Sequence, residues 1–357
     1  MRMKVFGMAA LLLVLGGIIT LIRPVSQARA DNALQNIPRL EGVNIYFTEA
    51  GGESSRFDRS DAGISRFAGL LRQLGANLYT LEWRTGFPTD ADVIVIAGPQ
   101  TDFTPDQIAR LWAYVNNGGR LLMLANPVVE TQRAALPPTS GFFQLMWADF
   151  GLRALGDLLI NDQRGADTDD PDGVLTVFTT TNVSTQHPIT NGVEGELAFF
   201  GARSLEVDAS IQSFIVTPLV FADPDFYGET DFARFTREGV LEYNIGTDTA
   251  PGSRAVAGAF EDPRTNSRMV LIGDADFARN GAGFLTAPRY SAAFVYPSNV
   301  RFLVNAVSWL ADAEPVTLTF PPPGATETPT ITPTPTETRT PTPDAQAAAT
   351  ATPSAGG

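Results

Sequence analysis

The sequence predicts an α/β protein built on a doubly wound, mostly parallel sheet with helices on both faces. Two observations predict this fold class. Segments of strand character alternate with segments of helical period over residues 43–125, and the strand predicted at residues 93–97 is apolar at every position. A strand without a polar position is typical of a sheet that is covered on both faces.

The elements of the first half follow in regular order. Residues 43–47 form the first predicted strand, residues 77–81 the second and residues 93–97 the third. Apolar residues at helical spacing form one face of a helix between the first two strands, and Gly75 ends it. This face consists of Ile64, Phe67, Ala68, Leu71 and Leu74.

A second helix is predicted to begin at Pro105. Thr104 precedes this helix and Gln107 stands at its third position, so the two side chains can form a capping box. The pair Gly118-Gly119 ends the helix, and residues 121–125 form the next buried strand. Strand, helix and strand therefore repeat as a parallel sheet requires.

The middle of the chain is predicted to be rich in strands, followed by a return of the α/β pattern. The expected middle strands are residues 174–180, 197–207 and 214–222. A polar, glycine-bearing insertion at about 223–252 comes next. Strands at 255–260 and 269–272, in the pattern of a hairpin, and a helix at 299–310 close the body. We expect a single α/β domain over residues 40–313.

The amino-terminal segment, residues 1–30, predicts export. Residues 5–22 are an uninterrupted apolar run behind Arg2 and Lys4, and about 20 helical residues span a bilayer. Two routes stay open. A secretory signal would be cleaved after Ala30 and give a secreted protein, whereas a signal anchor would hold the body outside the membrane.

The carboxy-terminal segment, residues 314–357, is rich in threonine and proline. Repeated proline removes amide donors and little apolar surface is left to bury, so we expect an extended, disordered tail. It is either a stalk, glycosylated or spanning a cell wall, or an inert end.

Composition excludes several classes of function. The net charge of −14 disfavours binding to nucleic acid, because phosphate backbones are repelled. The chain has no cysteine, which excludes disulfides and thiolate chemistry. Its only lysine is Lys4, so no Walker loop is possible, and no G-x-G-x-x-G motif follows a strand. We expect no cofactor.

Polar side chains follow the predicted parallel strands, where ligands of open α/β sheets bind. These candidate rim residues are Thr48, Glu49, Gln100, Asn126, Asp274 and Asp276. The set lacks a nucleophile paired with a base, and we assign no catalytic residue. For Asp274 and Asp276 the favoured interpretation is structural: the carboxylates cap a turn or bind an arginine.

Two further features of the sequence are candidate sites. His187, the only histidine, precedes Pro188, and a loop hydrogen bond explains it better than catalysis, since no G-x-S-x-G motif or cysteine accompanies it. The weak metal candidate is a loop with Asp167, Asp169, Asp170 and Asp172, whose carboxylates suit calcium. Its spacing misses the EF-hand pattern by one residue, and an exposed acidic turn explains it as well. We assign no metal.

Four segments in this order resemble a known family. They are residues 91–127, residues 187–190 with 201–205, residues 269–280 (MVLIGDADFARN) and residues 300–311 (VRFLVNAVSWLA). Together they are similar to the auxiliary domain of gliding-motility-type ABC transporter accessory proteins and of related membrane-tethered proteins. The resemblance implies a fold like that of class I glutamine amidotransferases, with a flavodoxin-like sheet but without the catalytic cysteine. It also implies a transmembrane helix at one or both ends, and here a Thr-Pro tail stands where a second one would be.

The leading hypothesis is a non-enzymatic extracytoplasmic accessory or binding component held at the membrane by its amino-terminal helix. Its expected partners are the permease and ATPase of an ABC-type transport system, or a component of the cell envelope. One alternative is an exported surface or wall module that binds glycan or protein. Another is a metal-assisted hydrolase that uses Asp274 and Asp276.

Overall fold

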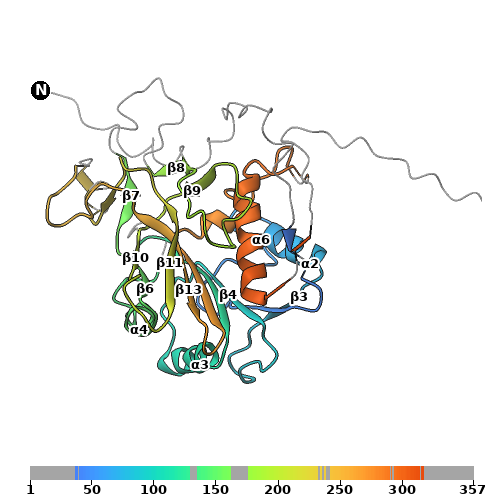
Figure 1. Ribbon diagram of the computed structural model, residues 1–357. Helices are drawn as coiled ribbons and strands as arrows, with labels where there is room; N and C mark the ends of the chain where they lie inside the picture. The colour runs from blue at the N-terminus through green and yellow to red at the C-terminus, as the bar shows by residue number, and fades with distance from the viewer. Residues whose placement is uncertain are drawn as a thin grey trace, which may run out of the picture. The chain divides into compact units, whose positions relative to one another are not determined.

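The core of the protein, seen in a computed structural model, is a seven-stranded sheet (Figure 1). Its strands, from one edge to the other, are β11 (Ile215–Phe221), β13 (Ala255–Asp262), β14 (Ser267–Ile272), β5 (Arg120–Leu124), β4 (Val93–Ala97), β2 (Asn44–Phe47) and β3 (Asn77–Thr80). The strands from β14 to β3 pair in parallel, and β11 and β13 add to β14 in antiparallel register. The structure describes residues 37–38, 40–128, 135–161, 176–231, 234, 237–238, 242–289, 291, 293–313 and 315–316.

Small antiparallel pairs of strands accompany the large sheet. They are β1 (Ile37–Pro38) with β15 (Pro315–Val316), β6 (Leu152–Ala154) with β10 (Leu205–Val207), β7 (Leu158–Ile160) with β12 (Tyr227–Glu229), and β8 (Val177–Thr180) with β9 (Leu197–Phe200). The single strand expected at 197–207 is wrong. Gly201 lies there with a φ of 99°, a left-handed conformation that strands do not use, so β9 ends before it and β10 begins after it on another partner.

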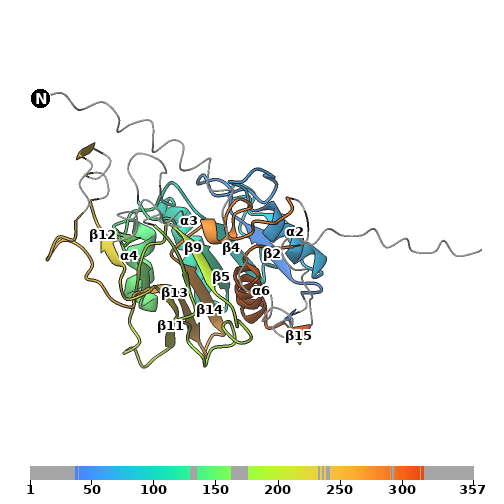
Figure 2. The ribbon, with the colours of Figure 1, turned by 90° about the horizontal axis from the view of Figure 1, so that it is seen from above.

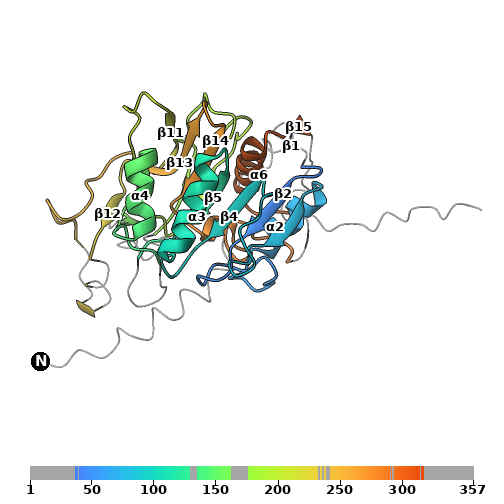
Figure 3. The same ribbon diagram turned by 90° about the horizontal axis from the view of Figure 1, so that it is seen from below.

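Helices cover both faces of the large sheet (Figures 2 and 3). The helices α2 (Ser65–Gln73) and α6 (Pro297–Ala311) share one hydrophobic cluster, and α3 (Pro105–Asn116) and α4 (Gly141–Phe150) share the other. Strand β4 shows why: Val93 and Val95 belong to the first cluster, whereas Ile94 and Ile96 belong to the second. The all-apolar sequence of β4 therefore reflects burial on both sides, as expected.

The start of α3 follows from its sequence. The Thr104 side chain accepts the amide of Gln107 at 3.3 Å, and the Gln107 side chain accepts the amide of Thr104 at 2.8 Å. This reciprocal pair is the predicted capping box. The helix ends before Gly118, which has a φ of 90°, and a Cβ there would lie 2.8 Å from the Thr265 carbonyl oxygen. A glycine is therefore required on both conformational and steric grounds.

The prediction of an α/β fold with a mostly parallel sheet is confirmed. The helix α4 was missed, because its buried residues Phe142, Phe143 and Met146 sit in a sequence that is apolar almost all round, without a clear polar face. In the described part of the chain, no helix is both long and apolar enough to span a bilayer. The predicted export segment at 1–30, with its apolar run at 5–22, lies outside the described residues, as does the predicted tail at 314–357 apart from residues 315–316 of β15.

The chain divides into two compact units, Met1–Ala325 and Thr326–Gly357, and every described residue belongs to the first. The expected domain limits at 40 and 313 stay a prediction. The expected insertion at about 223–252 contains β12, which pairs with β7.

Candidate functional site

The parallel strands β2, β4, β5 and β14 end at one edge of the sheet, which we call the carboxyl edge. The six predicted rim residues lie at this edge, with unequal exposure. Thr48, Asn126, Asp274 and Asp276 are buried, Glu49 is half-buried, and Gln100 is exposed. Most of the polar groups that the sequence places at the rim are thus turned into the protein.

Direct contacts lock the loops of the carboxyl edge together. The Asn126 side-chain oxygen, after β5, accepts the amide of Ala275, after β14, at 2.8 Å. Arg279 donates through Nε to the Ser54 hydroxyl at 3.0 Å and pairs through Nη1 with Asp276 at 2.5 Å. Gly98, after β4, has a φ of 71°, and a Cβ there would lie 2.9 Å from the Cβ of Ala275. The edge is a closed junction of four loops.

Asp274 is the most deeply buried acid of the junction, with no exposed surface. Its Oδ2 accepts the amide of Phe200 at 2.7 Å, and its Oδ1 accepts the amide of Asp276 at 2.8 Å. Burial and the neighbouring Asp276 charge raise the pKa of Asp274, whereas the two amides and Arg279 act in the opposite direction. The Asp274 carboxyl group therefore connects β9 to the turn after β14, which is a structural role.

The loop after β2 closes over the end of β4. The Gly51 carbonyl accepts the amides of Gln100 at 2.8 Å and Thr101 at 3.2 Å, and Glu49 Oε1 accepts the Ser55 hydroxyl at 3.2 Å. Among the described residues of this loop, two buried side-chain oxygens, Thr48 Oγ1 and Glu53 Oε1, have no hydrogen-bond partner. These two oxygens are acceptors that the loop leaves unused.

Two buried side chains that organise the edge were not predicted from the sequence. Arg279 bridges two loops as described, and Asn280 is fully buried. The Asn280 amide group donates to the carbonyls of Asp58 at 3.0 Å and Ser60 at 2.8 Å, and its oxygen accepts the amide of Arg66 at 3.0 Å. The sequence feature that could have indicated these two residues is the segment DADFARN, in which an arginine and an asparagine follow the apolar strand β14 and its two aspartates.

His187 lies far from the carboxyl edge. Its ring packs edge-on against Trp309 of α6, with 4.9 Å between ring centroids, and its Nδ1 accepts the amide of Ile189 at 3.2 Å. Arg268, whose charge acts on His187, stands near the start of β14, whereas Asp274 follows its end. At about 3.3 Å per strand residue the two positions are about 20 Å apart, so His187 and Asp274 do not form one site.

We predict that His187 makes the protein sensitive to acid. Burial, and then the Arg268 charge, lower the pKa of His187 from 6.5 to about 4. The folded state binds this proton less readily than the unfolded state, so the stabilising contribution is complete above pH 6.5 and is lost as the pH falls through about 4. Because His187 is partly exposed and solvent-screened, we expect an effect of about 1–2 kcal/mol. Urea unfolding of wild type and His187→Gln at pH 7.5 and 4.5 measures it.

The His187→Gln variant should show the smaller loss between these two pH values. His187 is the only histidine, so no other imidazole contributes to the difference between the two proteins. An equal loss in wild type and variant would contradict a lowered pKa of His187.

The described residues contain no group of three or more His, Asp or Glu side chains arranged to hold a metal ion. The weak candidate loop with Asp167, Asp169, Asp170 and Asp172 lies outside the described residues. The carboxylates of the carboxyl edge are engaged by backbone amides and by arginine.

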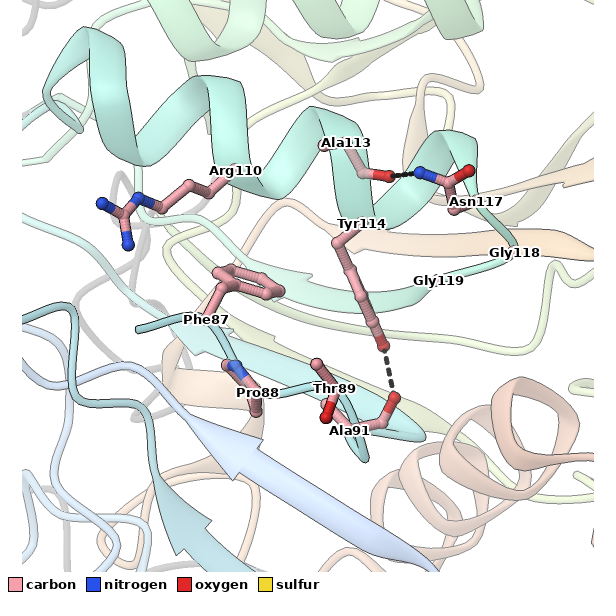
Figure 4. A pocket seen from close by; sticks show the side chains of 10 residues that line it. All are labelled: Phe87, Pro88, Thr89, Ala91, Arg110, Ala113, Tyr114, Asn117, Gly118 and Gly119. Atoms are coloured by element: carbon pink, nitrogen blue, oxygen red, sulfur yellow. Dashed lines mark hydrogen bonds between the residues drawn. The ribbon is translucent and has the colours of Figure 1, made fainter. Parts of the chain in front are cut away.

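A hollow of about 470 Å³ opens at the opposite end of the strands (Figure 4). It lies between α3 and the segment that precedes β4, and its lining includes Phe87, Pro88, Arg110 and Tyr114. The Tyr114 hydroxyl lies at hydrogen-bond distance, 3.3 Å, from the carbonyl oxygens of Ala91 and Asp92. Burial raises the pKa of Tyr114 to about 12, so the phenol stays neutral at physiological pH. This hollow was not anticipated, because its lining combines a loop with a helix end.

The sequence match that decides the family covers most of the folded body. The family described as an ABC-type uncharacterized transport system matches residues 43–306. The chain belongs to this family. The resemblance to its auxiliary domain, predicted from four short segments, is confirmed.

The segments that carry the family resemblance contact one another. Arg203, fully buried, donates its backbone amide to the Gly273 carbonyl at 2.8 Å and its Nη1 to the Asn126 carbonyl at 3.0 Å. Asn305 of α6 donates to the Ile189 carbonyl at 2.9 Å. In this member of the family, the motifs therefore build the framework that holds β5, β14 and α6 to the middle of the chain.

Comparison with solved structures adds little beyond the family. The chain is similar to an "mmIFT52 N-terminal domain" (12% identity, TM-score 0.48, covering 75% of this chain and 97% of that one). It is also similar to cytoplasmic protein STM3548 from Salmonella typhimurium (14%, 0.41, 76% and 99%) and to a ThuA-like protein from Parabacteroides merdae (12%, 0.38, 81% and 96%). Likenesses at these identities and TM-scores support no functional inference. No curated protein matches the chain.

Proposed function

We propose that the chain is a non-enzymatic accessory component of an ABC-type transport system that binds the permease and ATPase complex. The observation that carries this proposal is the family match over residues 43–306. The closed carboxyl edge supports it, since Asp274, Asp276 and Arg279 are engaged with one another and with the backbone. We also infer a doubly wound, amidotransferase-like sheet. The strand order β3-β2-β4-β5-β14 and the helices on both faces support this inference.

Co-purification tests the proposed partner. The full-length chain, tagged at its carboxyl end, is expressed with the permease and ATPase subunits of an ABC-type transport system from the same organism and isolated in mild detergent. We expect all three proteins to elute together from size exclusion. Elution of the tagged chain alone, at subunit concentrations of micromolar or above, would reject the partnership.

The location that goes with this proposal is the membrane, with the body outside. It rests on the apolar run at residues 5–22 behind Arg2 and Lys4. Protease added to spheroplasts should digest the body, and a cytoplasmic marker protein should survive. Full protection of the body would reject this location.

We predict no hydrolytic activity. Asp274 is fully buried and bound by two amides, and His187 lies near the other end of β14, so these two groups do not meet as nucleophile and base. The purified protein should not hydrolyse glutamine, ester or glycoside substrates, with or without divalent metal ions. Turnover that is lost in Asp274→Asn or His187→Ala would instead support the hydrolase alternative.

The hollow beside α3 favours a second candidate function, the binding of a glycan or of another protein. Phe87 and Tyr114 offer aromatic surface, and Arg110 offers a hydrogen-bonding guanidinium, a combination that ligand sites use. Soluble cell-wall glycan fragments should then bind the wild type and bind Phe87→Ala about tenfold more weakly. Equal affinities, or no binding by the wild type, would remove this candidate.

A further inference from the structure

The two edges of the large sheet are protected very differently. The β11 edge carries Pro218 and two irregularities of register, between Pro218 and Val220 and between Val220 and Phe221. A neighbouring segment also covers it, because the amide of Ser184 donates to the Leu219 carbonyl at 2.8 Å. Proline, bulges and a covering segment are the usual means by which proteins prevent strands from adding to an edge.

The β3 edge has none of these devices in the part of the chain that the structure describes. Its sequence, Asn-Leu-Tyr-Thr, contains no charge and no proline, and its parallel register with β2 is regular. No described strand pairs with its outer side (Figure 1). An open edge of this kind is a template for another strand.

The direction of the free backbone groups follows from the bonds on the inner side. The amides of Asn77 and Leu81 donate to the carbonyls of Val43 and Phe47, both at 2.8 Å. Because backbone groups alternate along a strand, the amide and carbonyl groups of Leu78 and Thr80 point away from β2. Two residues therefore present two donors and two acceptors to an incoming strand.

Exposed aromatic side chains flank this edge. Tyr79 is 41% exposed and stacks on Tyr46 with 4.8 Å between ring centroids. Phe57 is 62% exposed, and the Arg56 guanidinium lies 3.9 Å from the centre of its ring. Arg56 also donates to the Thr80 hydroxyl at 3.2 Å, so it connects Phe57 to strand β3. Aromatic residues and arginine are enriched where proteins bind each other.

The loop that carries Phe57 is held in place before any partner arrives. Asn280 binds the carbonyls of Asp58 and Ser60, and the Asp58 side chain accepts the amide of Ser60 at 2.7 Å. A preformed loop loses little conformational entropy on binding, which favours affinity.

We propose that β3 receives an extended segment of a partner protein, which adds to the large sheet as an eighth strand. On one face of the sheet the segment carries an apolar side chain that packs on Tyr79, and on the other face, near Thr80, it carries a carboxylate that meets Arg56 beside Phe57. Arg56 is half-buried, and its guanidinium, beside Phe57 and Thr80, supplies the positive charge for this carboxylate. A second copy fits less well, because β3 contains no acid and each chain carries a net charge of −14.

This inference rests on the proposed function for its partner, the permease and ATPase complex. Binding is measured with that complex in lipid nanodiscs and with the full-length chain. Thr80→Pro removes one outward amide without touching a bond to β2, and Tyr79→Lys places a charge on the edge. Ile215→Lys is the matched control, since Ile215 is an exposed apolar residue, 53% accessible, on the protected β11 edge.

Both β3 variants should bind about tenfold more weakly or worse, whereas Ile215→Lys should bind within about twofold of the wild type. Bound wild type should also show slowed hydrogen exchange at the amides of Leu78 and Thr80. Melting curves identify a variant that fails to fold, and the exchange measurement on wild type does not depend on the variants.

The outcomes separate the two proposals. Wild-type binding that both folded β3 variants retain, without protection of Leu78 and Thr80, overturns the β3 inference and leaves the proposed function intact. Absence of wild-type binding overturns the proposed function and this inference with it. A dimer in light scattering that Tyr79→Lys abolishes would make the occupant a second copy and overturn the assigned partner.

Discussion

Asp274→Ala should lower the free energy of unfolding by about 2–4 kcal/mol, because it leaves the buried amides of Phe200 and Asp276 without an acceptor. Urea unfolding at pH 7 measures this as a lower midpoint with an unchanged slope. Asp274→Asn keeps one acceptor oxygen but turns an NH₂ group toward the second amide, so it should fall between alanine and the wild type.

Asp208→Ala is the matched control for the Asp274 variants. Asp208 accepts the amide of Ser210 two residues on at 3.0 Å, the same local turn as Asp274 with Asp276, but on the surface. Its loss should cost less than about 1 kcal/mol, as surface substitutions usually do. Equal effects of Asp208→Ala and Asp274→Ala would show that the turn alone, and not the buried link to β9, sets the stability.

The same carboxyl group should make the stability depend on pH. Burial and the Asp276 charge raise the pKa of Asp274 to about 7. A raised pKa means that the folded state holds the proton more tightly, so the contribution is complete below about pH 4 and is lost as the pH rises through about 7. The stability difference between wild type and Asp274→Asn should therefore shrink from pH 5 to pH 8. A difference that grows over this range would contradict the raised pKa.

Asn280→Ala should lower the free energy of unfolding by about 2–4 kcal/mol, since Asn280 is fully buried and makes two backbone bonds to the loop after β2 and one to the first turn of α2. Asn280→Asp should be no better, because a carboxylate oxygen would replace the NH₂ group that faces the carbonyls of Asp58 and Ser60. Thermal melts with circular dichroism measure both. The loop that displays Phe57 should loosen at the same time.

Asn117→Ala provides the control for Asn280. Asn117, like Asn280, donates from its NH₂ group to a backbone carbonyl, but it makes only one such bond, to Ala113 at 2.7 Å, and it is exposed. We expect a change within about 0.5 kcal/mol. If Asn280→Ala were as mild as Asn117→Ala, the loop after β2 would owe its position to other contacts.

Elements with local causes could be predicted from the amino-acid sequence alone. The alternating segments around β4, the capping box at Thr104 and the end of α3 before Gly118 all follow from residues that are neighbours in the chain. The family could also be recognised from the sequence, since its motifs are short and follow one another in order along the chain. Burial on both faces of β4 could be predicted because an all-apolar strand has no side that water could solvate.

The roles of the polar residues depend on contacts between residues that are far apart in the chain. Asn126 and Ala275 are separated by 149 positions, and Arg279 reaches Ser54 across 225, so no spacing along the sequence could pair them. The same holds for the separation of His187 from Asp274 and for the contrast between the open β3 edge and the covered β11 edge. Backbone and side-chain hydrogen bonds need atoms within about 3 Å of each other, and only the packing of the sheet and its helices brings residues so distant in the chain to that distance.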